Sequence, residues 1–418
     1  MSDNCTKRET CRLCGERGLE LVLPIAATPP GDHYVSASQL AEEQETYPLD
    51  IALCGRCGLA QLAYTVNPDI LYGRYVYVSS ISLGLVDHFR DYADEVLKRI
   101  IPSDGTFMVD VGSNDGSLLR AFQARGLRVL GVDPAADIAR LATESGVETW
   151  AGYFGPDVAR KIRSERGAAG IVTANNVTAN VDDMAGFMEG IRHLLAPDGV
   201  FVFETSYLLD VLEKNLVETV FHEHLSYYSV KPLEAFFRKL GMQLIDVQRV
   251  PTKGGSIRGT VQLAGGPRTA SASVAGLITL EEQNGLDRPE VFRTYSERLD
   301  AVKKDLLRLL GDLKAQGKSV AGYGASVGVT TLLYQFDLSS HLAFIADDNP
   351  RKQNTFSPGH HIPVLPSSAL YDRKPDYVLI LAWNYAAPIM KKHRSFSEQG
   401  GRFIVPLPEV KLIPAGKP

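Results

Sequence analysis

Short apolar runs alternate with helically patterned segments over most of the chain. The apolar runs lie at 107–111, 128–132, 170–174 and 200–204, the last after an expected turn at 196–199. Helical spacing of apolar positions is found at 83–99, 117–123 and 184–195. Alternating buried strands and amphipathic helices are typical of a parallel sheet covered by helices, so the pattern predicts an α/β protein.

A charged stretch with helical spacing, 280–316, separates this part from a second series of strands. The second series comprises a strand and glycine turn at 319–326 and strands at 342–347, 377–382 and 402–405. The chain is therefore predicted to contain two Rossmann-like units joined by a helical connector.

Composition narrows the class of protein. The chain has 418 residues, 44% of them hydrophobic, enough for two or three domains at roughly 150 residues each. The net charge of −5 and the lack of a basic block argue against a nucleic-acid binder. No apolar run is long enough to cross a bilayer, and the polar start shows no signal-peptide pattern, so we expect a cytoplasmic protein without membrane contact.

Four of the five cysteines form two C-x-x-C pairs, Cys11 with Cys14 and Cys54 with Cys57, each followed by glycine. Two such pairs predict four thiolate ligands around one zinc ion, a closed site with a structural role. The alternatives are unrelated reduced pairs or a redox C-x-x-C. The insert 21–49 between the pairs is expected to form a small subdomain, and Cys5 is left over.

A glycine-rich loop follows the first strand of the central part. Asp110, Gly112 and Gly116 form D-x-G-x-x-x-G, and Asp133 ends the next strand. The spacing resembles the S-adenosylmethionine (SAM) loop of class I methyltransferases, with Asp133 placed to bind the ribose hydroxyls. The alternative is a nicotinamide-binding Rossmann domain.

Three other segments carry candidate chemistry. The hydroxyl-rich segment 72–80, with Tyr75 and Tyr77, is either an active-site wall or an amphipathic connector. The cluster 222–224, His-Glu-His, lacks the H-E-x-x-H spacing of a zinc protease. Its place just past the unit with the glycine-rich loop suggests acid–base groups, and the alternative is structural histidines. The turn 253–258 has two cationic residues, Lys253 and Arg258, and is either a phosphate-binding site or a solvated loop.

Together these motifs resemble the SAM-dependent sugar C-methyltransferases, which act at C3 or C5 of nucleotide-activated deoxysugars. The resemblance covers nearly the whole chain. It is carried by the C-x-x-C pairs, Y-x-Y-x-S-S at 75–80, the loop 110–116, Asn-Asn-Val at 175–177, H-E-H-x-x-Y-Y at 222–228, G-G-S-x-R at 254–258, G-Y-G-A at 322–325 and D-D-N-P-x-K-Q at 347–353. It implies a zinc-binding domain (1–72), a class I methyltransferase core (73–286) and a C-terminal Rossmann-like domain (287–418) that helps bind the sugar nucleotide.

The resemblance also implies roles for residues. His224 would be the base that forms an enolate beside a 4-keto group, Glu223 would orient a histidine or bind a sugar hydroxyl, and Tyr75 and Tyr77 would be donors near the sugar. The expected SAM contacts are Asp110, Gly112, Asn114, Asp115, Gly116, Asp133, Pro134, Phe154, Asn175 and Asn176. The expected substrate contacts are Asn180, Phe221, His222, Lys253, Arg258, Tyr323 and Lys352.

Four positions depart from the family pattern. Asn180 replaces an active-site histidine, Phe221 a tyrosine, Lys253 a histidine and Gly328 a lysine. Because asparagine and phenylalanine cannot handle protons, two other hypotheses stay open. One is changed chemistry, epimerisation or methylation of a non-sugar enolisable ketone, and the other is a non-catalytic binding protein. A monomer is expected, because one chain can close the site between its own domains.

Overall fold

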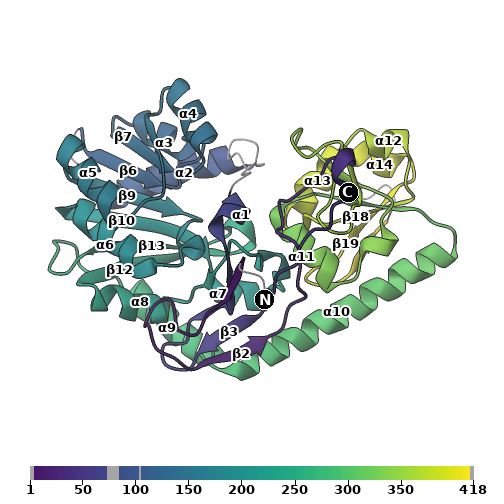
Figure 1. The fold of residues 1–418 in the computed structure, drawn as a ribbon, viewed down its shortest axis with the longest axis horizontal. Coiled ribbons are helices and arrows are strands. Elements are labelled where there is room, and N and C mark those ends of the chain that lie inside the picture. Colours follow the sequence, from purple (N-terminus) through teal and green to yellow (C-terminus); the bar gives the residue numbers. More distant parts are fainter. Residues whose placement is uncertain (1–3, 73–83, 103–104, 415–418) are drawn as a thin grey trace.

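The computed structural model describes residues 4–72, 84–102 and 105–414. Figure 1 shows a central α/β unit and a C-terminal α/β unit, with the N-terminal segment between them. In the described part of the chain, no helix combines the length and apolar composition needed to cross a membrane.

The central unit is a mixed sheet with the strand order β12-β13-β10-β9-β6-β7-β8. Its strands are β6 (Phe107–Val111), β7 (Arg128–Asp133), β8 (Thr149–Ala151), β9 (Ala169–Asn175), β10 (Leu195–Ser206), β12 (Met242–Val250) and β13 (Ser256–Leu263). The first five pair in parallel, and β13 is antiparallel to both β10 and β12. The expected turn at 196–199 lies inside β10, because Leu195 already pairs with Ala169 before a shift in register at Val200.

Helices cover both faces of this sheet. They are α2 (Leu85–Ile100), α3 (Ser117–Gln123), α4 (Ala136–Glu144), α5 (Pro156–Arg166), α6 (Met184–Leu194), α7 (Leu208–Glu213), α8 (Val230–Lys239) and α9 (Ala272–Asn284). Neighbouring residues on β6 point to opposite faces: Met108 packs with α2 and α3, and Val109 lies in the cluster that contains α5, α6 and α8. Both faces of β6 are buried, which explains its continuous apolar run.

The N-terminal unit shares a sheet with the central unit. Strands β2 (Leu19–Leu23), β3 (Ile51–Cys54) and β4 (Ala60–Leu62) continue into β11 (Ser226–Tyr227), which follows the His-Glu-His segment. A separate pair joins β1 (Cys5–Lys7) to β5 (Tyr64–Val66), and the short helices η1 (Ala37–Gln39) and α1 (Pro68–Tyr72) complete the unit.

The insert between the cysteine pairs crosses to the C-terminal unit, and we call residues 25–45 the strap. Val35 bridges Phe356, the Tyr34 hydroxyl donates to the Ala325 carbonyl at 2.8 Å, and Asp32 pairs with Lys352. In Figure 1 this purple segment lies against the yellow-green unit. The strap therefore connects the N-terminal unit to the C-terminal unit, whereas the sequence suggested a small subdomain for the insert.

The charged stretch predicted as one helical connector forms two helices. Helix α9 ends at Gly285, whose φ of 63° is left-handed, and α10 (Pro289–Ala315) begins with a proline. The boundary proposed between 286 and 287 lies in this break. Helix α10 runs from the central unit to the C-terminal unit (Figure 1).

The C-terminal unit has the strand order β16-β17-β15-β14-β18-β19-β20. Its strands are β14 (Val320–Tyr323), β15 (Ile345–Asp347), β16 (Thr355–Phe356), β17 (Pro363–Pro366), β18 (Tyr377–Ile380), β19 (Arg402–Val405) and β20 (Lys411–Ile413). Its helices are α11 (Val327–Gln335), α12 (Ala369–Asp372), α13 (Ala386–Lys392) and α14 (Arg394–Glu398). The inner strands are parallel and the two edge strands antiparallel, as a second Rossmann-like unit requires.

Candidate functional site

The four cysteines of the two C-x-x-C pairs meet in space. All four Sγ atoms lie within 4.8 Å of one another, with Cys11 to Cys57 at 3.5 Å and Cys14 to Cys54 at 3.6 Å. A disulfide needs about 2.05 Å, whereas thiolates at about 2.3 Å from a shared ion have this wider spacing. The donor set fits zinc with no open position, so the zinc is structural; Cys5 is not in the cluster.

A cavity of about 420 Å³ opens at the carboxyl ends of β6, β7 and β9. One end of it, the cofactor end, collects most of the SAM contacts expected from sequence: Asp110, Gly112, Asn114, Asp133, Pro134, Phe154, Asn175 and Asn176. Asp115 and Gly116 are not among the lining residues. Asp115 accepts a hydrogen bond from the Ser117 amide, and Gly116 caps α3, so both shape the turn behind the cavity.

Asp133 is held rigidly at the cofactor end. Its carboxylate accepts hydrogen bonds from the amides of Asn114 and Ala135, both at 2.9 Å, and burial raises its pKa against these bonds. Gly112 has a φ of 72°, and a Cβ there would collide with Val177, so the loop backbone itself forms the cavity wall. These residues fit SAM, because a carboxylate suits the ribose diol and a bare backbone allows close approach.

The other end of the cavity, the substrate end, is lined by Asn180, Asp182, His222, Glu223 and Lys253. These residues come from the loop after β9, which includes η3 (Thr178–Asn180), from the segment before β11 and from η5 (Thr252–Gly254). The first two segments are tied together, because the Leu225 amide donates to the Ala179 carbonyl at 2.7 Å and the Tyr228 hydroxyl to the Thr178 carbonyl at 2.9 Å.

Hydrogen bonds assign the tautomers of both histidines in the His-Glu-His segment. His222 Nε2 lies 3.1 Å from the Tyr47 carbonyl and His224 Nδ1 lies 2.8 Å from the Thr219 carbonyl, and a carbonyl only accepts. The second nitrogen of each ring therefore carries a lone pair. Burial lowers the pKa of both imidazoles to about 4, so both are neutral at pH 7.

The two histidines differ in position. His222 lines the cavity, and its buried Nδ1 has no hydrogen-bond partner among the described residues. His224 is absent from the lining and stacks on Phe221, with ring centroids 5.1 Å apart and planes 8° from parallel. Phe221, expected as a substrate contact, is likewise not a lining residue.

Glu223 lies between them as a buried carboxyl group at the cavity wall. Burial, reinforced by the nearby charge of Asp32, raises its pKa to about 8, so it is protonated at pH 7. Its Oε2 has no hydrogen-bond partner in the described part of the chain. A neutral base and a carboxylic acid therefore stand side by side at the substrate end.

Besides Phe221, three other expected substrate contacts lie outside this cavity. Arg258 faces Glu204 across the β10–β13 pair and binds it at 2.9 Å, and it also pairs with Glu95. The Tyr323 hydroxyl donates to Asp348 at 2.7 Å, and the Lys352 ammonium lies 2.6 Å from the Asp32 carboxylate of the strap. Protein partners occupy all three groups, so the phosphate role suggested for Arg258 and the substrate contacts expected of Tyr323 and Lys352 have no support here.

Of the other expected positions, Tyr75 and Tyr77 lie outside the described residues. The departure at Gly328 has a steric cause: a Cβ there would collide with the Glu218 carbonyl of η4 (Val217–Thr219), so no lysine fits. The sequence did not reveal Asp182, which lines the cavity, or Arg12, which pairs with it, because no motif marks the two residues as a pair.

Family models match a zinc binding domain over residues 11–72, a methyltransferase domain over 86–247 and a C-methyltransferase C-terminal domain over 251–408. The chain is 35% identical over 416 residues to the C-methyltransferase NovU of Streptomyces niveus, covering 99% of both proteins.

Two solved structures are similar to less than half of this chain. A SAM-dependent methyltransferase from Clostridium acetobutylicum is 12% identical and covers 43% of this chain and 92% of its own, with a TM-score of 0.35. Magnesium protoporphyrin IX methyltransferase from Synechocystis is 16% identical and covers 46% and 90%, with a TM-score of 0.33. The full-length relative and the family models together show that the chain belongs to the family of SAM-dependent C-methyltransferases with an N-terminal zinc-binding domain.

Proposed function

We propose that the protein methylates a carbon next to the ketone of a nucleoside-diphosphate 4-keto-6-deoxysugar, at C3 or C5, through an enolate. The observation that carries the proposal is that one cavity has both sets of groups. Its cofactor end has Asp133 and the glycine loop, and its substrate end has a neutral imidazole and a carboxylic acid group. An enolate needs a base for the C–H proton and a donor for the oxygen that gains charge.

The charge states of the histidine and of Glu223 decide which of them removes the proton and which donates to the oxygen. A neutral imidazole takes the proton from the carbon and becomes an imidazolium. The protonated Glu223 donates a hydrogen bond to the C4 oxygen as negative charge develops there. Bound SAM supplies an electrophilic methyl group, which the enolate carbon accepts.

Either histidine could be the base. The family resemblance assigns His224, whereas the cavity lining favours His222, whose Nδ1 has no partner among the described residues. Lys253 is the only lysine or arginine among the described residues that line the cavity. We therefore assign it the role of binding the diphosphate of the substrate.

The test is incubation with SAM and a panel of nucleoside-diphosphate 4-keto-6-deoxysugars. S-adenosylhomocysteine and a sugar heavier by one methyl group are expected, and neither product from any sugar would refute the proposal. His222→Asn and His224→Asn separate the two assignments, because the variant that lacks the base stops both methyl transfer and exchange of the sugar C–H with deuterated water. Exchange without methylation by the wild type would instead indicate epimerisation.

A further inference from the structure

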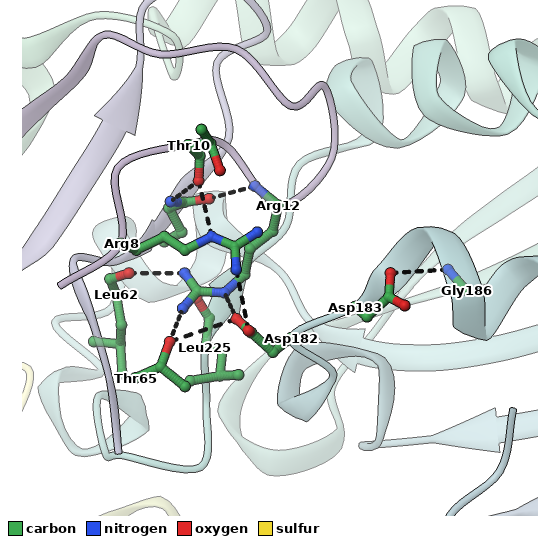
Figure 2. Close-up of polar contacts among 10 residues, drawn as sticks. Arg8, Thr10, Arg12, Leu62, Thr65, Asp182, Asp183, Gly186 and Leu225 are labelled. Carbon is green, nitrogen blue, oxygen red and sulfur yellow. Dashed lines mark hydrogen bonds and ion pairs between the residues drawn. The ribbon is translucent and has the colours of Figure 1, made fainter. Parts of the chain in front are cut away.

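Arg12 lies inside the first C-x-x-C pair, between Cys11 and Cys14, and its side chain is fully buried. Figure 2 shows its guanidinium surrounded by acceptors. Nε donates to Asp182 Oδ1 at 2.8 Å, and Nη2 donates to Thr65 Oγ1 at 2.7 Å. Nη1 donates to the carbonyls of Leu62 at 2.7 Å and Leu225 at 3.4 Å.

These partners belong to three segments that the chain brings together only on folding. Leu62 and Thr65 are on β4 and β5, Leu225 follows His-Glu-His, and Asp182 follows Asn180. Thr65, Asp182 and Leu225 all line the cavity. Arg12 is thus bonded to the segments that carry the substrate end.

The cofactor end is held in another way. Its loop and Asp133 are fixed by the parallel pairing of β6 with β7 and by the amide bonds to Asp133. In the described part of the chain Arg12 makes no hydrogen bond to either strand, so we expect its loss to leave this scaffold intact.

We propose that Arg12 is a positioning residue that couples the zinc site to the substrate end of the cavity. Cys11 and Cys14 fix the backbone on both sides of Arg12, and the guanidinium transmits that position to the segments 177–183 and 222–226. The zinc site then serves substrate binding as well as the stability of its own domain. The consequence for turnover rests on the proposed function, whereas the coupling itself does not.

The chain offers a matched control. Arg8 also pairs with Asp182, at 3.1 Å, and donates to the Thr10 carbonyl. It is partly exposed, and its side chain makes no hydrogen bond to the described residues Leu62, Thr65 or Leu225. Arg12→Met and Arg8→Met therefore remove the same charge from the same cluster (Figure 2). Arg12→Lys keeps the charge and restores part of the bonding.

Three measurements on the full chain test the coupling: hydrogen exchange by mass spectrometry, calorimetric affinity for S-adenosylhomocysteine, and kinetics with the sugar that the wild type methylates. In Arg12→Met we expect exchange in 177–183 and 222–226 to quicken about tenfold or more, because buried carbonyls lose a charged donor. Exchange in 107–123 and the affinity for S-adenosylhomocysteine should stay within about threefold of wild type. KM for the sugar should rise about tenfold or more, with a lesser rise in Arg12→Lys and none in Arg8→Met. Removing zinc with a chelator should give the same exchange pattern.

Three results would overturn the inference: equal effects of Arg8→Met and Arg12→Met, unchanged exchange in 222–226, or equal loss at the two ends of the cavity. If Arg12→Met does not fold, Asp182→Asn replaces it and is compared with Arg8→Met, because the Asp182 side chain is 41% exposed and its loss removes the ion pairs with both arginines. Unchanged exchange in Asp182→Asn then overturns the inference. Absence of sugar methylation by the wild type would count against the proposed function alone, since exchange and cofactor affinity need no sugar.

Discussion

Glu223 gives the sharpest quantitative prediction, because its ionisation is linked to folding. Its pKa is about 8 in the folded protein against an ordinary value of 4.5. Between these values the unfolded chain has lost the proton that the folded chain keeps, so stability falls as pH rises. One pKa unit corresponds to about 1.36 kcal/mol, which gives a cost of about 3 kcal/mol at pH 7 and about 5 kcal/mol above pH 8.

Glu223→Gln keeps the shape of the protonated acid and removes the titration. The variant should therefore be more stable than wild type by an amount that grows from about 1 kcal/mol at pH 5.5 to about 3 kcal/mol at pH 7 and levels off above pH 8. Urea unfolding at several pH values, followed by circular dichroism, measures this difference. Glu189→Gln on the exposed side of α6 is the control for the replacement of a glutamate by glutamine. A constant difference for Glu223→Gln over the same range would refute the reasoning.

Three further changes test other parts of the structure. Asp133→Asn should weaken calorimetric binding of S-adenosylhomocysteine by about tenfold to a hundredfold, because the ribose loses a charged acceptor; unchanged affinity would contradict the placement of the cofactor. Gly328→Ala should lower the free energy of unfolding by about 1–3 kcal/mol, seen as a lower melting temperature, because its Cβ meets the Glu218 carbonyl; an unchanged melting temperature would argue against that contact. Lys352→Met should speed limited proteolysis within the strap about tenfold, because Asp32 loses its partner; equal cleavage rates would mean that this pair does not hold the strap.

The zinc ligands and the cofactor fold were predictable because their chemistry is local. Two cysteines with two residues between them can reach one ion through a single turn, and cysteine is recognisable in the sequence as a zinc ligand. The D-x-G-x-x-x-G loop likewise combines a strand, a turn and a helix within a few residues of chain. Cys11 and Asp110 could therefore be assigned from the printed sequence, and the structure brings each together with its expected neighbours.

Charges were harder to assign. Arg258 follows a glycine-rich turn and suggests a phosphate site, yet the pairing of β13 with β10 places Glu204 opposite it. Lys352 is neutralised by Asp32, 320 residues away. Sequence motifs cannot predict these ion-pair partners, because an ion pair requires only that two side chains lie close in space and not that they have a fixed separation in the sequence.

The sequence by itself thus determined the fold class, the two C-x-x-C pairs and the glycine-rich loop, because each motif depends on residues close together in the chain. Only the tertiary structure decided which titratable groups face the cavity and in which charge state. Desolvation and long-range partners set those states, as for Glu223, which burial and Asp32 keep protonated. Tertiary structure also brought Arg12 together with its acceptors, which lie up to 213 residues away in the chain.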